Sequence, residues 1–147
     1  ARVTATVRRE ELRPRVEQLG ARAIAPEGFV EHGPYDVILE RHVLWTLPQP
    51  KEAVRAWQAL LRPGGLLILI EGIFEMSDRT IYPQLEAQLP LYGGRPGEEL
   101  AMLLEAEGFV QTAVRPLMDV AMWLETPTRP RFMVTGRSPT DASSSQS

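Results

Sequence analysis

The sequence contains no cysteine, which excludes disulfide bonds, thiolate metal ligands and cysteine nucleophiles. It has two histidines, His32 and His42, which are too few for a histidine-based metal site. It has no run of about 18 apolar residues and no signal-peptide pattern, so neither a membrane span nor a secretory signal is predicted. Positive charge is not in excess, since the net charge is −3, which argues against a nucleic-acid surface. We therefore expect a cytoplasmic protein that binds neither nucleic acid nor membrane.

The composition is that of a folded globular protein, with 44% hydrophobic and 24% charged residues. A length of 147 residues allows one domain, which we place at residues 1–137. Four of the last five residues are serine, so residues 138–147 are predicted to be a disordered tail. The chain opens with Ala1 and not with Met, directly in a predicted strand, which suggests a piece of a longer protein.

The rest of the chain is arranged around residues 33–72, which predict a strand, a helix and a second strand. The apolar run at residues 37–39 precedes a helix that begins at Pro50, where the missing N–H costs no hydrogen bond. Residues 63–65, Pro-Gly-Gly, end that helix. Residues 66–70 are then apolar without alternation, as in a parallel strand that is covered on both faces.

In open α/β sheets, small ligands bind beyond the carboxyl ends of the parallel strands. The residues that follow the two strands are therefore the informative ones. They are Glu40, Arg41 and His42 after the first strand, and Glu71 after the second. These polar side chains mark the edge of the sheet where we expect a site.

Helical spacing and short apolar runs predict the remaining elements. Both flanks of the central segment are expected to contain strands and helices, with the last two strands antiparallel because no strong helical stripe connects them. The predicted elements are a strand at 2–7, a short helix at 8–19 with an irregular first turn near Pro14, a strand at 21–25, a loop at 26–34, a short helix with Tyr82 and Leu85, a helix at 98–107, and strands at 109–117 and 131–136.

Several of these segments resemble the class I S-adenosylmethionine-dependent methyltransferases. The resemblance rests on residues 35–39 (YDVIL), on residues 61–65 (LRPGG) before the next strand, and on residues 105–109 (EAEGF) before the last strand pair. It implies a Rossmann-like, doubly wound α/β sheet of order 3-2-1-4-5-7-6, mostly parallel with a C-terminal antiparallel pair. It also implies an enzyme that uses S-adenosylmethionine to methylate a small molecule.

In this family, strand 1 carries a Gly-rich loop, and the chain starts at strand 2, so the first strand is missing. Its absence would leave backbone groups unpaired between strands 2 and 4. We expect either direct pairing of residues 2–7 with residues 35–39 or a groove between them. An unpaired edge could also support a homodimer.

The resemblance matches four residues to contacts with the cofactor. Glu40, Arg41 and His42 match the segment whose backbone carbonyls suit the methionine ammonium group. Glu27 matches the family's acidic contact to the adenine amino group, although a surface turn residue is an equal alternative. His42 could be a base for the acceptor or a hydrogen-bonded structural residue.

The aromatic residues have a structural and a functional interpretation. Trp45 and Trp57 are predicted to be core aromatics. Trp123 is predicted to line an acceptor pocket with Tyr92, Tyr82 and Asp119.

A second family offers an alternative for the start of the chain. Residues 2–28 also resemble the nucleotide-binding domains of medium-chain dehydrogenases, in which an arginine after the second strand binds the NADP 2′-phosphate. Arg8 and Arg9 stand there, either in that role or simply solvated. The alternative functions are thus an NADPH-binding fragment of a medium-chain reductase or a non-catalytic remnant.

Overall fold

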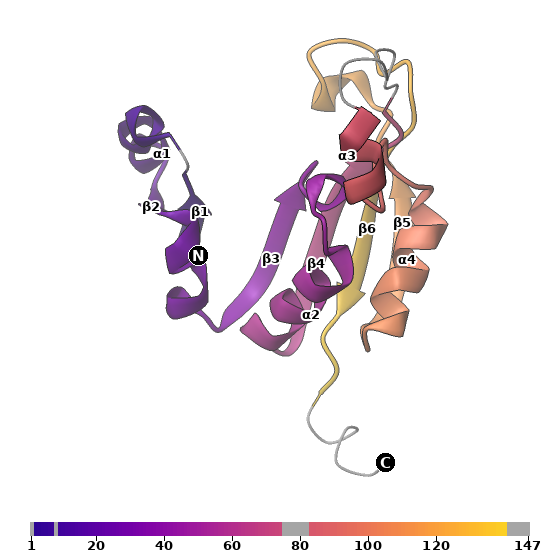
Figure 1. Ribbon diagram of the computed structural model, residues 1–147. Coiled ribbons are helices and arrows are strands. Elements are labelled where there is room, and N and C mark those ends of the chain that lie inside the picture. Colours follow the sequence, from indigo (N-terminus) through magenta and orange to yellow (C-terminus); the bar gives the residue numbers. More distant parts are fainter. Residues whose placement is uncertain (1, 8, 75–82, 141–147) are drawn as a thin grey trace. The chain divides into compact units, whose positions relative to one another are not determined.

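The structure is a computed structural model that describes residues 2–7, 9–74 and 83–140 (Figure 1). It divides into two compact units, residues 1–34 and residues 35–147. This boundary lies inside the single domain that the sequence predicts for residues 1–137. Along the described residues, no helix has both the length and the apolar character needed to cross a membrane.

In the first unit, β1 (Val3–Thr6) pairs in parallel with β2 (Ala21–Ile24). The helix predicted at residues 8–19 is shorter: α1 spans Arg13–Gln18 and follows a 3-10 turn at Glu10–Leu12. The irregular start that the sequence predicts is therefore confirmed, since Pro14 lacks the N–H of a regular helix.

The link after β2 contains a 3-10 helix, Pro26–His32, where a loop was predicted. Pro26 stands at its first position, where its fixed φ favours a helical turn.

The second unit is a four-stranded sheet in the order β3-β4-β6-β5. Strand β3 (Tyr35–Arg41) is parallel to β4 (Leu61–Gly72), and β6 (Arg131–Arg137) is antiparallel to both β4 and β5 (Val110–Pro116). The predicted antiparallel pair at the C-terminal end is confirmed. The order matches the 4-5-7-6 half of the expected sheet.

The sheet of β1 and β2 is separate from the four-stranded sheet, and β3 is an end strand of the latter. Direct pairing of residues 2–7 with residues 35–39, or a groove between them, stays a prediction. The homodimer through a sheet edge stays a prediction.

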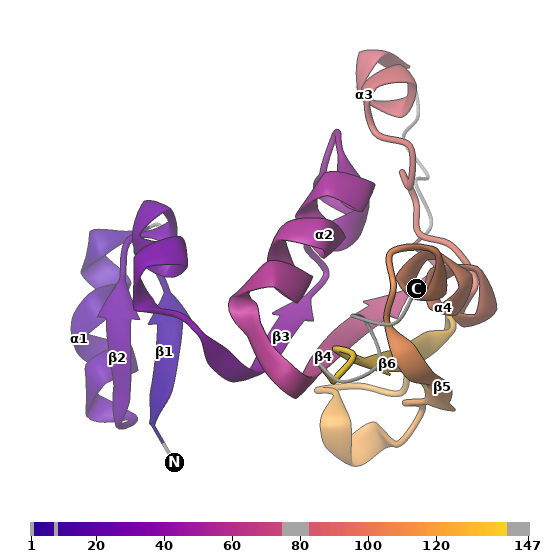
Figure 2. The same ribbon diagram turned by 90° about the horizontal axis from the view of Figure 1, so that it is seen from below.

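Two helices lie on one face of the four-stranded sheet, α2 (Pro50–Leu60) and α4 (Gly97–Ala106) (Figures 1 and 2). The predicted start of α2 at Pro50 is confirmed, and its Val54 is fully buried. Alternate residues of the central strands form the core; Leu67 and Leu69 on β4 and Val134 on β6 are fully buried.

The opposite face of this sheet is apolar but more open. The side chains of Val37 and Leu39 on β3 are 50% and 60% exposed. Residues 66, 68 and 70 of β4 are half-buried. That residues 66–70 are covered on both faces stays a prediction.

The chain stays ordered past residue 137, where the tail was predicted to begin. The Ser138 N–H donates to the Gly65 carbonyl at 2.8 Å, and the Gly64 N–H donates to the Ser138 carbonyl at 3.0 Å. These bonds fasten Ser138 to the start of β4. The short helix predicted with Tyr82 and Leu85 is found as α3 (Pro83–Gln88), which contains Leu85. Residues 141–147 and Tyr82 lie outside the described residues.

Candidate functional site

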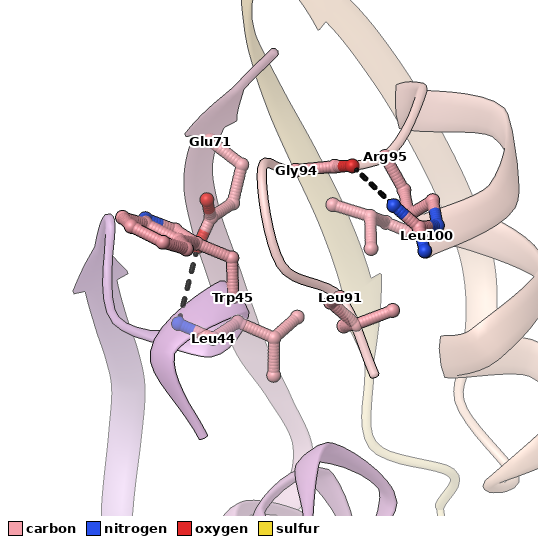
Figure 3. Close-up of a pocket in the computed structure, with 7 residues that line it drawn as sticks. All are labelled: Leu44, Trp45, Glu71, Leu91, Gly94, Arg95 and Leu100. Atoms are coloured by element: carbon pink, nitrogen blue, oxygen red, sulfur yellow. Dashed lines mark hydrogen bonds between the residues drawn. The ribbon is translucent and has the colours of Figure 1, made fainter. Parts of the chain in front are cut away.

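Two buried glutamates hold the loop that follows β3. Glu40 Oε2 accepts hydrogen bonds from the N–H groups of Val43 (2.8 Å) and Leu44 (3.1 Å). Glu71, one residue past the part of β4 that pairs with β3, accepts from the same Leu44 N–H at 3.2 Å (Figure 3). Glu40 and Glu71 are 6% and 1% exposed. The two carboxyl groups therefore fix residues 43–44 at the carboxyl end of both parallel strands.

The two carboxyl groups do not ionise independently. Burial, followed by the charge of Glu40, raises the pKa of Glu71 to about 9. Burial also raises the pKa of Glu40, while its hydrogen bonds with Glu71 and the loop N–H groups oppose this. At neutral pH Glu71 is thus protonated and can donate to Glu40.

His42 follows β3 in an unusual backbone conformation. Its φ is +56°, in the left-handed region that non-glycine residues rarely adopt. Its N–H donates to the Ile70 carbonyl at 3.0 Å, while its Nε2 is buried without a hydrogen-bond partner among the described residues. Burial, then the charges of Arg41 and Arg131, lower the pKa of His42. The imidazole is therefore neutral near pH 7 and can accept a proton.

His42 belongs to a group of side chains that we call the arginine–aromatic cluster: Arg41, His42, Phe74, Trp123 and Arg131. The His42 ring meets Phe74 edge-on at 4.9 Å between centroids and lies parallel to Trp123 at 6.1 Å. The guanidinium carbons of Arg41 and Arg131 lie 5.1 and 5.7 Å from the Trp123 centroid. Arg131 also lies 4.7 Å from the Phe74 centroid.

Trp45 lies on the other side of Phe74 and is half-buried, as is Trp57. Its ring is 5.3 Å from Phe74 and 5.8 Å from Tyr92, and its Nε1 is buried without a partner among the described residues. Trp45 therefore packs against other aromatic side chains and also adjoins the arginine–aromatic cluster through Phe74. Tyr92 contacts Trp45, and the exposed Asp119 accepts the Ala121 N–H at 2.9 Å.

A narrow pocket lies between the Glu71 carboxyl group and the turn before α4 (Figure 3). It leaves no room for a water molecule, so it is a packing gap. Its lining residues are Leu44, Trp45, Glu71, Leu91, Gly94, Arg95 and Leu100. A hollow of about 430 Å³ lies beside the start of β4, at the opposite end of that strand, and is lined by Arg55, Gln58, Ala59, Leu61, Pro63, Ser138 and Pro139.

The predicted site residues fall into both units. Glu40, Arg41 and His42 lie together in the second unit, whereas Glu27 is exposed in the first turn of the 3-10 helix after β2. Arg8 lies outside the described residues, and Arg9 is exposed.

Sequence reasoning missed Phe74 and Arg131. The signal for Arg131 was present, because an antiparallel pairing of β4 with the last strand places it opposite Gly72.

Residues 3–69 match the family model described as a methyltransferase domain. The chain is 24% identical over 134 residues to 6-hydroxymellein synthase cdmE of Talaromyces verruculosus, an alignment that covers 76% of this chain and 5% of that protein. The chain thus spans about a twentieth of the length of this curated relative.

Two solved structures share the fold. The S-adenosylmethionine-dependent methyltransferase SibL in its apo form has a TM-score of 0.62 at 21% identity, over 94% of this chain and 43% of that one. The CurJ carbon methyltransferase has a TM-score of 0.68 at 16% identity, over 95% and 42%.

Proposed function

We propose that this chain carries a class I S-adenosylmethionine-dependent methyltransferase domain, which binds S-adenosylmethionine and methylates a small molecule. The match of residues 3–69 to the methyltransferase domain carries the proposal, because these residues run from β1 into β4. The carboxyl ends of such parallel strands are where a nucleotide cofactor binds in open α/β sheets. As part of the same proposal we place the protein in the cytoplasm, since a chain without cysteine suits a reducing compartment.

The end of β3 fits a polar ligand. Three buried polar atoms have no partner among the described residues: Glu40 Oε1, His42 Nε2 and Trp45 Nε1. Two can accept hydrogen bonds and one donates, so a ligand with both kinds of group would satisfy them. We assign cofactor contacts to the backbone of Glu40, Arg41 and His42, and propose Glu27 as a contact to the adenine amino group.

The chain's own residues would contribute alignment and proton transfer. When bound, S-adenosylmethionine supplies an electrophilic methyl group, so the protein's main task is to position the acceptor and exclude water. The glutamate pair fixes the loop that presents His42 and Trp45. A neutral His42 would take the proton of the acceptor at Nε2.

The NADPH alternative is not favoured. The family match and the solved structures that share the fold are methyltransferases. Arg8 and Arg9 suggested a site for the 2′-phosphate. Arg9 is exposed, and Arg8 lies outside the described residues.

Calorimetric titration of the chain tests the proposal. We expect saturable heat with S-adenosylmethionine and none with NADPH. Glu27→Gln should weaken the binding of S-adenosylmethionine by about 2- to 10-fold, the value of one hydrogen bond. Glu11→Gln, which also changes an exposed acid of the first unit, should leave it unchanged. Heat with NADPH alone would support the reductase, and heat with neither ligand the non-catalytic remnant.

A further inference from the structure

The arginine–aromatic cluster holds two positive charges without neutralising them. The guanidinium groups of Arg41 and Arg131 both lie within 6 Å of the centroid of Trp123. Among the described residues, neither group forms an ion pair with a carboxylate. Arg131 makes two long contacts of 3.4 Å, from Nη1 to the carbonyls of Ile73 and Pro130. Cation–π contacts hold an arginine in place but leave its N–H donors available.

Hydrogen bonds fix the positions of Trp123 and of the chain at Phe74. Trp123 Nε1 donates to the Leu117 carbonyl at 2.9 Å, which sets the orientation of the indole. The Ile73 N–H donates to the Pro130 carbonyl at 3.1 Å, which ties the chain at Phe74 to the start of β6. Rigid aromatic faces beside free guanidinium donors suit a ligand that is planar and negatively charged.

We propose that the methyl acceptor is an aromatic or enolic carboxylate, bound by Arg41 and Arg131 through its carboxylate, with its planar part beside the aromatic side chains of the cluster. This rests on the proposed function, since it names the acceptor class of that reaction. The single negative charge of the bound carboxylate attracts both guanidinium groups and offsets the repulsion between them. In this proposal the hydroxyl or enol group of the same molecule is the group that His42 deprotonates at its unpartnered Nε2.

Ligand binding can be measured without the cofactor. We would titrate the chain with 4-hydroxybenzoate and with its neutral analogue 4-hydroxybenzamide, and follow the indole N–H signals by NMR. Trp123→Phe identifies the Trp123 signal. We expect that signal to move with the acid, and the acid to bind at least about tenfold more tightly than the amide, as charge-assisted hydrogen bonds require.

Arginine variants then locate the site. Arg41→Met and Arg131→Met should each weaken 4-hydroxybenzoate about tenfold, whereas Arg131→Lys, which keeps the charge and guards against a folding defect, should weaken it less. Arg62→Met is the matched control, because Arg62 is an exposed arginine of the same unit that pairs with Asp36 at 3.4 Å.

Equal binding of acid and amide, or equal losses in Arg62→Met and Arg41→Met, would overturn the inference. If S-adenosylmethionine binds while 4-hydroxybenzoate does not, the inference alone fails. If 4-hydroxybenzoate binds while S-adenosylmethionine does not, the proposed function fails and the anion site stands.

Discussion

Replacing Glu71 by glutamine should increase the free energy of unfolding at pH 8 by about 1–3 kcal/mol and reduce its pH dependence between pH 5 and 9. Glu71 is 1% exposed and its pKa is raised to about 9, by burial and then by the charge of Glu40. A glutamine side chain is uncharged at every pH. Its oxygen can still accept the Leu44 N–H and its amide can still donate to Glu40, so the loop contacts are kept.

The sign follows from proton binding in the two states. The unfolded chain releases the Glu71 proton near its ordinary pKa of 4.5, whereas the folded chain keeps it until about pH 9. Between these values the folded state binds more protons, so the free energy of unfolding falls as pH rises, by up to about 1.4 kcal/mol per pH unit. The contribution of protonated Glu71 to the free energy of unfolding is complete below pH 4.5 and is lost as pH rises through about 9.

Urea unfolding at several pH values between 5 and 9 measures this effect. Glu125→Gln is the control, because it makes the same exchange of side chain at an exposed position. Its pH profile should follow that of the unchanged chain. A Glu71→Gln variant that is less stable at pH 8, or that keeps the original slope, would show that Glu71 is ionised in the folded protein.

The central part of the fold could be predicted because each boundary has a local cause. Pro50 starts α2, an apolar run forms β4, and the segment before β6 has no helical stripe, so β5 and β6 pair antiparallel. The 3-10 helix at Pro26–His32 was not predicted, since the link between the two strands is too short for a full crossover helix. Which face of β4 is covered was also beyond the sequence, because coverage depends on distant elements.

The candidate site could likewise be predicted from the sequence only in part. The polar residues after β3 and β4 could be located, because the carboxyl ends of parallel strands share one edge of a sheet. The proton on Glu71 could not be predicted, since it depends on the depth of burial and the distance to Glu40. The arginine–aromatic cluster joins residues from position 41 to position 131, and only the register of β4 with β6 brings Arg131 to Phe74.

A second large effect on stability is expected at Gly94, in the turn before α4. Gly94→Ala should destabilise the second unit by about 2–4 kcal/mol. Gly94 has a φ of +87°, which disfavours any side chain, and an added Cβ would overlap the Gly72 carbonyl oxygen at the end of β4. The Phe74 N–H donates to the Gly93 carbonyl at 2.8 Å beside it, so the turn cannot move away without breaking this bond.

Gly64→Ala separates the two causes of the lost stability, which are the positive φ and the overlap of the added Cβ with a neighbouring atom. Gly64 also has a positive φ, +75°, but the nearest atom to its added Cβ is Thr140 Cγ2 at 3.9 Å. It should therefore cost only the conformational term, about 1 kcal/mol. Urea unfolding of both variants gives the difference between their losses of stability, which measures the close approach of the turn to β4.

The turn also bears on ligand binding, because it places Tyr92 against Trp45. Gly94→Ala should therefore also weaken S-adenosylmethionine binding, while Gly64→Ala leaves it unchanged. Equal destabilisation by both variants would mean that the turn does not press on the end of β4.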